Sequence, residues 1–423
     1  MVYKKRIVDD MMALKLRSKG AVVIEGPKWC GKTTTALQQS KSVLKVDEPD
    51  KRQDNLELSR IKPSLLLEGE TPRLIDEWQV APLLWDAIRN EVDKRSLEGQ
   101  FILTGSSVGS ESTEITHSGT GRFTWLKMRT MSLFESDESS GEVSLSELFK
   151  TPEEITGKNK LSINDIAFAI SRGGWPHSIN MDKDVALLQA YDYYDGIVKS
   201  DVNRVDGISK NEERVKKLLR SYARNIGTQA SYSSIKKDTA VNDSDAISEN
   251  TLLTYINALK KIYVIEDMPA WNPNLRSKTA IRTADTRYFS DPSIAVASLG
   301  LGVEDLFEDM KTFGFLFESL VVRDLRIYAD SIGGNVYHYR DKNDLECDAV
   351  IHLRNGRYGL IEIKLGGEEA IKEAAKSLKK VYEKIDTDKM KEPSFMMIVI
   401  GVGDFAYKRE DGIYIVPIGC LKN

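Results

Sequence analysis

Short apolar runs separated by helical stretches dominate the first third of the chain. The runs expected to form strands are 21–25, 42–47, 73–77, 101–105 and 123–128. Helices are expected to begin near Lys32 and to span 82–93. Because strands that alternate with helices form mainly parallel sheets with helices on both faces, residues 1–135 are predicted to be an α/β domain.

The pattern changes after residue 135. Residues 136–180 open with an acidic, serine-rich stretch and are expected to be a linker and connecting region. Residues 181–310 become helical and end in a strand–turn–strand region, which predicts a winged-helix-like domain. Its helices are expected at 212–227, 232–239 and 248–263, and the later turns at Pro269, Asn272 and Pro273. Residues 311–423 run helix, three strands, helix and two strands, which predicts a third, α/β unit with its own core.

The composition fits a soluble globular protein of two or three domains. The 423 residues are 41% hydrophobic and 29% charged, and the net charge of −4 gives the whole molecule no general attraction for nucleic acid. The three cysteines are far apart, which favours a reducing compartment over a disulfide framework. The longest apolar run, 395–403, is well short of the about 20 residues of a membrane helix. We therefore expect a cytoplasmic protein without membrane contact.

Residues 26–33 read Gly-Pro-Lys-Trp-Cys-Gly-Lys-Thr and have the full spacing of a phosphate-binding loop (P-loop) between a predicted strand and a predicted helix. Glycines let backbone N–H groups wrap phosphates, Lys32 would reach the β and γ phosphates, and Thr33 would ligate Mg²⁺. The residues expected to bind ATP are Gly26, Pro27, Lys28, Trp29, Cys30, Gly31, Lys32, Thr33, Thr34 and Thr104. A chance strand–turn–helix is the alternative interpretation.

Two adjacent carboxylates follow the third predicted strand. Asp76 would complete the Mg²⁺ shell, because ligands of open α/β sheets lie beyond the carboxyl ends of the strands. Glu77 would polarise the attacking water, which favours hydrolysis over small-molecule phosphorylation. The alternative is a pair that only caps the next helix.

Two further motifs are candidates for the same chemistry. The run 101–106 is expected to form the strand between the other two, with Thr104 or Ser106 sensing the γ-phosphate, and a plain buried strand is the alternative. Arg122 is a candidate arginine finger that would act within the chain or on a neighbouring copy. A surface ion pair is the alternative for this arginine.

Acidic residues and a lysine recur at strand spacing near the C-terminus. Glu362 and Lys364 lie on one face of the predicted strand 359–364, because side chains alternate along a strand. A two-residue turn would pair Asp348 with Ile363, whereas a three-residue turn would pair it with Glu362. Only the longer turn separates apolar from polar faces, so we prefer it.

Asp348, Glu362 and Lys364 would then converge, and Glu318 could approach them from an amphipathic helix. Two carboxylates can bind Mg²⁺ or Mn²⁺, and a lysine can stabilise the charge that develops on a phosphorane. This is a nuclease-type arrangement. A solvated strand face that carries a salt bridge is the alternative.

The helical region has only a modest positive charge. Residues 212–290 contain 13 Lys and Arg and 9 Asp and Glu, which gives a net charge of +4. That permits DNA binding without forming a strong basic stripe. A winged helix that only packs against its neighbours is the alternative.

The order of motifs resembles that of the bacterial and archaeal AAA-like P-loop ATPases with a C-terminal domain of unknown function. The motifs are GPKWCGKT, LIDEWQ, FILTGSS, GTGR, RGGWP, FGFLFESLVVRDL and YRDKNDLECDAVI with IEIKLGG. The resemblance covers nearly the whole chain. The acidic insert near 137–150 and the tryptophan of RGGWP depart from it, and neither touches a matched motif.

The resemblance implies an ASCE-type ATPase domain, a winged-helix-like middle and a C-terminal core similar to restriction endonucleases. Its ATPase motifs match Lys32, Thr33, Asp76 and Glu77, and its nuclease-like motif matches Glu318, Asp348, Glu362 and Lys364. Three functions follow as hypotheses. The chain is an ATPase that repositions a DNA-binding or DNA-cleaving C-terminal half, a metal-dependent nuclease regulated by ATP, or a non-catalytic nucleotide-dependent switch or assembly protein. A nucleotide-dependent homo-oligomer is a further expected partner state.

Overall fold

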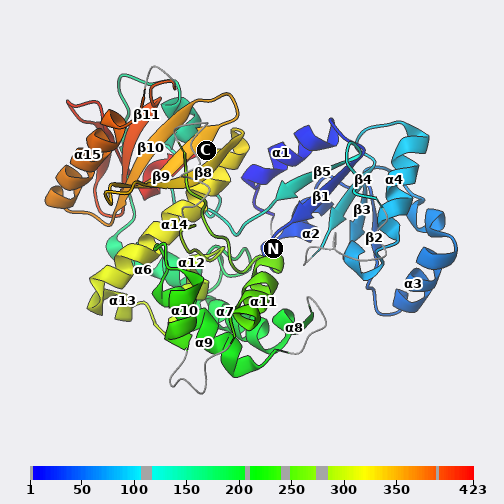
Figure 1. The fold of residues 1–423 in the computed structure, drawn as a ribbon. Helices are drawn as coiled ribbons and strands as arrows, with labels where there is room; N and C mark the ends of the chain where they lie inside the picture. The colour runs from blue at the N-terminus through cyan, green and yellow to red at the C-terminus, as the bar shows by residue number, and fades with distance from the viewer. Residues whose placement is uncertain (1–2, 106–116, 205–209, 240–247, 273–283, 387–389) are drawn as a thin grey trace. The chain divides into compact units, whose positions relative to one another are not determined.

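The computed structural model describes residues 3–105, 117–204, 210–239, 248–272, 284–386 and 390–423. The chain forms two compact units (Figure 1). One comprises Met1–Thr130 with Lys261–Tyr263, and the other comprises Met131–Lys260 and Val264–Asn423. Each unit is described by itself.

The first unit is built on a five-stranded sheet in the order β2-β3-β4-β1-β5, and every neighbouring pair is parallel. Its strands are β1 (Ala21–Glu25), β2 (Ser42–Lys45), β3 (Arg73–Asp76), β4 (Phe101–Thr104) and β5 (Phe123–Lys127). Its helices are α1 (Ile7–Leu16), α2 (Lys32–Leu37), α3 (Arg52–Ile61), α4 (Leu84–Arg95) and the 3₁₀ turns Pro63–Leu67 and Trp78–Val80. The predicted parallel sheet is confirmed, and β4 lies between β1 and β3 as expected.

Helices cover both faces of this sheet, because the strand side chains that point to one face and those that point to the other are both apolar. Val22 and Ile24 of β1 pack in one cluster with α1 and α2, whereas Ala21 and Val23 pack in a second cluster with α4. In the second cluster Trp85 stacks on Phe123, with ring centroids 4.0 Å apart. Two-sided burial explains why these strands read as continuous apolar runs.

The second unit contains a seven-stranded mixed sheet in the order β7-β12-β13-β11-β10-β9-β8 and a two-stranded sheet of β14 and β6. The strands are β6 (Val143–Ser144), β7 (Gly157–Lys158), β8 (Gly334–Arg340), β9 (Glu346–Leu353), β10 (Tyr358–Lys364), β11 (Phe395–Ile400), β12 (Phe405–Lys408), β13 (Tyr414–Pro417) and β14 (Leu421–Lys422). Four strands follow the last helix, where two were expected.

Helices make up the rest of the second unit. They are α5 (Leu145–Leu148), α6 (Ile163–Arg172), α7 (Lys183–Gly196) with a π-helical turn (Ile197–Asp201), α8 (Val202–Arg204), α9 (Glu212–Arg224), α10 (Tyr232–Thr239), α11 (Glu249–Lys261), α12 (Pro292–Leu299), α13 (Asp305–Glu308), α14 (Met310–Ser331), α15 (Glu368–Glu383) and the 3₁₀ turn Ile418–Cys420. The long helix α14 packs on β8, β9 and β10. The apolar side of α15 contributes to a separate core with β9, β10, β11 and β13.

Residues 136–180, expected to be a linker, do more than connect two domains. Strand β6 pairs with β14, and β7 pairs with β12, so this stretch supplies strands to the sheets at the C-terminus. The Ser139 hydroxyl also donates to the Leu421 carbonyl at 2.7 Å. A strand of two residues is too short to show an alternation of apolar and polar positions. The sequence of this stretch therefore indicated a linker from its acidic, serine-rich composition alone.

The three middle helices α9, α10 and α11 fall where they were expected. Antiparallel bridges then join Ile265 to Phe289 and Met268 to Thr286. Pro273 and the other residues of 273–283 lie outside the described residues, so the winged-helix assignment stays a prediction. Within the part of the chain that the structure describes, no helix is both long and apolar enough to cross a membrane.

The stacked tryptophan of the first unit gives a stability test. Replacing Trp85 with alanine removes a side chain that is 2% exposed, and we expect the unfolding free energy of this unit to fall by about 3–5 kcal/mol. Denaturant unfolding followed by a probe in the first unit measures the change. The control is Trp125→Ala, at a tryptophan that is 41% exposed, for which the loss should be well below that of Trp85→Ala.

Candidate functional site

The P-loop sequence follows β1 and leads into α2, as its spacing predicted. Gly26 and Gly31 have φ angles of 155° and 100°, which L side chains rarely adopt. A Cβ atom at Gly26 would also lie 2.0 Å from the carbonyl oxygen of Met128. The first glycine is therefore required by both its backbone conformation and the lack of space.

Lys32 lies inside this loop. Its side chain is 7% exposed, and its ammonium donates hydrogen bonds to the carbonyl oxygens of Gly26 at 2.8 Å and Pro27 at 2.7 Å. Of the other predicted loop residues, Cys30 is buried, Lys28 is half-buried, and Trp29 and Thr34 are exposed. The lysine is thus held within the loop, near where phosphates bind in loops of this spacing.

Asp76, at the end of β3, connects the end of β4 with the start of α2. One of its carboxylate oxygens, Oδ1, accepts hydrogen bonds from the hydroxyls of Thr33 at 2.9 Å and Thr104 at 2.5 Å. Asp76 and Thr104 are register partners on β3 and β4, and Thr33 is the second residue of α2. A threonine hydroxyl and a carboxylate are oxygen ligands that Mg²⁺ prefers, so these residues fit the predicted ion.

Glu77 directly follows β3 in the left-handed region, with φ 55° and ψ 42°. A hydrogen bond from the side-chain amide of Gln79 holds its carboxylate. Gln79 also lies against the end of β4, because a Cβ atom at Gly105 would meet its side-chain oxygen at 2.3 Å. The other sensor candidate, Ser106, lies outside the described residues.

Arg122 lies at the opposite edge of the sheet. Its carbonyl accepts from the N–H of Ala21, the first residue of β1, whereas the P-loop follows the last residue of that strand. At about 3.3 Å per strand residue, these two edges are roughly 13 Å apart. The Arg122 guanidinium forms an ion pair with Asp93 at 2.8 Å. The surface ion pair is therefore present, and an arginine finger acting within the chain is inconsistent with this geometry.

The predicted C-terminal cluster is brought together by the preferred register. Strands β9 and β10 pair Tyr358 with His352 and Ile361 with Ala349, so Asp348 comes opposite Glu362. Gly356 has a φ of 79°, as the three-residue turn requires. The prediction of the longer turn is confirmed.

Lys364 bridges the two carboxylates. Its ammonium lies 2.9 Å from Asp348 Oδ2 and 2.7 Å from Glu362 Oε2. Glu362 is 4% exposed, so this is not the solvated strand face of the alternative interpretation. Burial opposes the charge of the lysine, but the two carboxylates raise the pKa of Lys364 above its usual range.

Glu318 joins the cluster from α14, and Tyr288 donates a hydrogen bond from its hydroxyl to Glu318. Burial, followed by repulsion from Asp348, raises the pKa of Glu318 and that of Glu362 to about 8. Among the described residues, no three His, Cys, Asp or Glu side chains are placed to hold one metal ion together. A metal ion at Asp348 and Glu362 therefore stays a proposal.

Three polar partners of these sites were not predicted from the sequence. Arg6 donates to the carbonyl of Cys30 in the P-loop at 2.9 Å, Gln79 holds Glu77, and Tyr288 holds Glu318. Gln79 follows Glu77 by two residues and could have been suspected. Arg6 and Tyr288 are distant in sequence from their partners, so no local pattern indicates them.

Three family models match separate parts of the chain. Residues 18–136 match an AAA domain, residues 163–305 match a domain of unknown function (DUF8612), and residues 313–421 match a second domain of unknown function (DUF4143). No curated protein is detectably similar in sequence. The AAA match supports a nucleotide-hydrolysing first unit.

Two solved structures are similar over large parts of the chain. The Walker-type ATPase paby2304 of Pyrococcus abyssi is 15% identical, with a TM-score of 0.43, over 70% of this chain and 96% of that protein. A signal transduction ATPase with numerous domains (STAND) and a tetratricopeptide repeat sensor, PH0952 from Pyrococcus horikoshii, is 14% identical, with a TM-score of 0.26, over 78% of this chain. The match spans 50% of the latter protein. These two likenesses are too distant to support inferences about the site.

The raised carboxyl pKa values of the C-terminal cluster predict a pH dependence. Burial raises the pKa of Glu318 and that of Glu362 from the usual glutamate value of 4.5 to about 8 in the folded state. The folded state binds more protons between these values, so the unfolding free energy of the second unit should fall as pH rises through this window. Thermal unfolding at pH 5 to 8 measures the slope, and Glu362→Gln should flatten it. The control Glu368→Gln, at an exposed carboxylate on α15, should keep the wild-type slope.

Proposed function

We propose that the first unit binds ATP with Mg²⁺ and hydrolyses it. The hydrogen bonds that Asp76 accepts from Thr33 and Thr104 carry the proposal, because they gather a magnesium ligand pair and a sensor candidate at the end of the P-loop strand. The AAA match over residues 18–136 supports the same function.

Lys32 and the pair Thr33 and Asp76 would have separate roles in hydrolysis. Lys32 would exchange the carbonyls of Gly26 and Pro27 for the β and γ phosphates, where its charge offsets the charge of the transferring group. Thr33 and Asp76 would hold Mg²⁺, which neutralises phosphate charge when bound. The contacts of Lys32 and Mg²⁺ with phosphate oxygens would stabilise the transition state more than the ground state at those oxygens whose negative charge increases during phosphoryl transfer.

Glu77 would orient the attacking water and accept its proton. The amide of Gln79 fixes the Glu77 carboxylate beside the end of β4, where Thr104 lies. A sensor hydroxyl next to the magnesium carboxylate would distinguish nucleoside triphosphate from diphosphate. Arg122, at the far edge of the sheet, would then act only on the nucleotide of a neighbouring copy in a nucleotide-dependent homo-oligomer.

The ATPase proposal predicts that turnover and binding can be changed separately. Lys32→Ala should lower ATP turnover by about 100-fold or more because a phosphate cation is lost. Glu77→Gln should lower turnover by a factor on the order of 10²–10⁴ while ATP still binds, because only the base is lost. Steady-state phosphate release and equilibrium binding of a fluorescent ATP analogue measure the two quantities.

Lys94→Ala is the matched control for the ATPase test. This lysine lies on α4 with its side chain 77% exposed in an ion pair with Glu91, so turnover should stay at the wild-type value. Undiminished turnover in the Lys32→Ala protein would refute the proposed site.

We propose as a second candidate that the cluster of Asp348, Glu362 and Lys364 cleaves DNA when the two carboxylates bind Mg²⁺ or Mn²⁺. The observation that favours it is the convergence of these side chains within 2.9 Å on adjacent strands, with Glu318 beside them. A metal ion would displace Lys364 from at least one carboxylate and free its ammonium for phosphate charge. The ATPase would then reposition or regulate this half of the chain.

Incubation of the whole protein with plasmid and single-stranded DNA in Mg²⁺ or Mn²⁺ tests the nuclease candidate. Glu362→Gln and Asp348→Asn should each lower cleavage by about 100-fold or more because a metal ligand is lost. Glu368→Gln removes an exposed carboxylate that pairs with Lys372 and should leave cleavage unchanged. Cleavage that survives both cluster variants counts against this site. An inactive wild-type protein would favour the non-catalytic switch, for which size measurements with and without ATP are decisive.

A further inference from the structure

The segment Met128–Ser136, here called the connector, leads from β5 in the first unit to β6 in the second. Its beginning contacts the P-loop directly. The Met128 N–H donates to the Glu25 carbonyl at 2.7 Å, and the Cys30 thiol donates to the Met128 carbonyl at 3.8 Å. The same carbonyl occupies the space where a side chain at Gly26 would lie. A shift in the P-loop backbone would therefore reach the connector without an intermediate residue.

Arg6 strengthens this first attachment. Its side chain is buried, and its guanidinium donates to the Cys30 carbonyl at 2.9 Å and to the carbonyls of Arg129 and Thr130 at 3.0 and 3.2 Å. One rigid, planar group thus joins the P-loop backbone to the connector backbone. A buried guanidinium that lost these acceptors would be strongly disfavoured, so the loop and the connector are expected to move together.

The N-terminal segment fixes Arg6 itself. The Arg6 N–H donates to the Asp9 carboxylate at 2.8 Å, and the Tyr3 hydroxyl donates to Asp9 at 2.7 Å. Tyr3 also lies 3.0 Å from the hydroxyl of Thr35 on α2. The helix that follows the P-loop and the arginine that holds the P-loop are therefore tied to one another.

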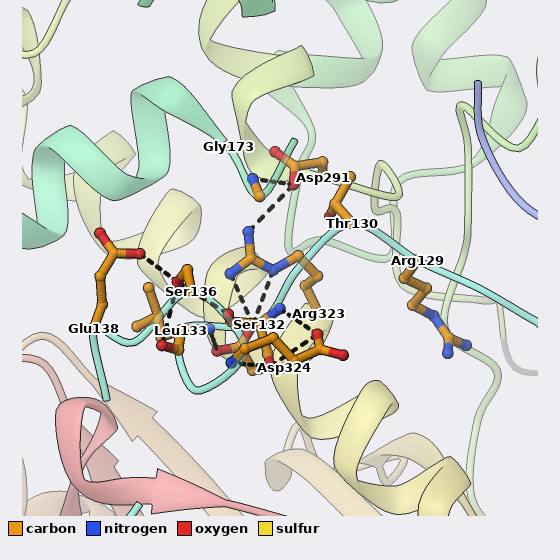
Figure 2. A network of polar contacts seen from close by, with 12 residues as sticks. Arg129, Thr130, Ser132, Leu133, Ser136, Glu138, Gly173, Asp291, Arg323 and Asp324 are labelled. Carbon is orange, nitrogen blue, oxygen red and sulfur yellow. Dashed lines mark hydrogen bonds and ion pairs between the residues drawn. The ribbon is translucent and has the colours of Figure 1, made fainter. Parts of the chain in front are cut away.

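The other end of the connector is held in the second unit by buried charges (Figure 2). The Leu133 N–H donates to Asp324 Oδ2 at 2.9 Å, and Arg323 donates to Asp324 Oδ1 at 2.9 Å. Arg323 also pairs with Asp291 at 3.2 Å, and Asp291 accepts from the N–H of Gly174 at 3.0 Å. These charged side chains are no more than 3% exposed. Charges so deeply buried have few alternative partners, so this attachment is stiff.

One further bond holds the connector backbone in the second unit, and another lies within the connector itself. The Met131 N–H donates to the Gly174 carbonyl at 2.6 Å, and Glu135 accepts from the N–H of Ser132 at 2.9 Å. The attachment to the first unit ends at Thr130 and the attachment to the second begins at Met131. The two sets of hydrogen bonds therefore involve adjacent residues of the connector.

We propose that the connector carries the nucleotide state of the P-loop into the second unit, with Arg6 as a positioning residue at the P-loop end. The proposal rests on the ATPase function proposed above. When phosphates replace the carbonyls that Lys32 now contacts, the P-loop backbone adjusts, and Arg6 and Cys30 pass the adjustment to Met128–Thr130. The next residues are fixed to Asp324 and Gly174, so the strain is delivered to the core around α14 and α6. Coupling of this kind is reciprocal, so ligands of the second unit alter ATP affinity by the same factor.

Hydrogen exchange of the full chain, with and without a non-hydrolysable ATP analogue and Mg²⁺, tests the proposal. In the wild-type protein, nucleotide should change exchange in the P-loop peptide and in peptides covering 131–138 and 318–330. The expected change in the second unit is about fivefold or more, the lower end of usual coupling between sites. Three glycines inserted between Thr130 and Met131 leave both sets of anchors intact. This insertion should abolish the change in the second unit and keep the change in the P-loop.

Arg6→Ala should remove the response of the second unit and also weaken ATP binding, because the Cys30 carbonyl loses its donor. Arg17→Ala is the matched control, at an exposed arginine that follows α1, and it should behave as wild type. Ethylguanidinium added to the Arg6→Ala protein should restore part of the ATP affinity, which a general loss of folding would not allow.

The outcomes separate this proposal from the ATPase proposal. A wild-type protein that hydrolyses ATP but shows no nucleotide-dependent exchange in the second unit overturns the coupling and leaves the ATPase intact. A response that persists in the glycine-insertion protein also overturns it. A protein in which neither turnover nor P-loop protection is seen refutes the ATPase function and the coupling with it.

Discussion

The two hydrogen bonds that Asp76 accepts from Thr33 and Thr104 depend on one constraint, the parallel order β3-β4-β1 of the first sheet. Parallel strands end at the same edge, so the P-loop after β1, the carboxylate at the end of β3 and the hydroxyl at the end of β4 must meet there. The same order sends Arg122 to the opposite edge. One topological constraint therefore places Thr33, Asp76 and Thr104 at one edge of the sheet and Arg122 at the other.

The C-terminal cluster depends on a different constraint, the register of a hairpin. A shift by one residue would turn Asp348 away from Glu362 and leave two carboxyl groups on opposite faces. The left-handed Gly356 in the three-residue turn fixes the observed register. Desolvation then raises the pKa of Glu362, because burial disfavours the charged form of its carboxyl group.

The polar network of the second unit joins residues that are far apart in the sequence. Leu133 and Asp291 come from separate segments and meet at the adjacent pair Arg323 and Asp324, where Leu133 donates to Asp324 and Arg323 pairs with Asp291 (Figure 2). A buried arginine of this kind stabilises little by itself, but it specifies which segments must lie together, since each unpaired charge would be costly. The stretch expected to be a linker is held by this network and by the pairing of β6 with β14.

The sequence by itself determined the α/β class, the P-loop and the hairpin register, because each depends on local spacing or strand periodicity. The tertiary structure decided the rest. It assigned residues 136–180 to the second unit, placed Arg122 away from the P-loop, and gave Arg6, Gln79 and Tyr288 their partners. The carbonyl of Cys30 and the carboxylate of Glu318 receive their hydrogen bonds because distant segments pack together. A local sequence pattern does not indicate which two buried polar groups will form such a bond.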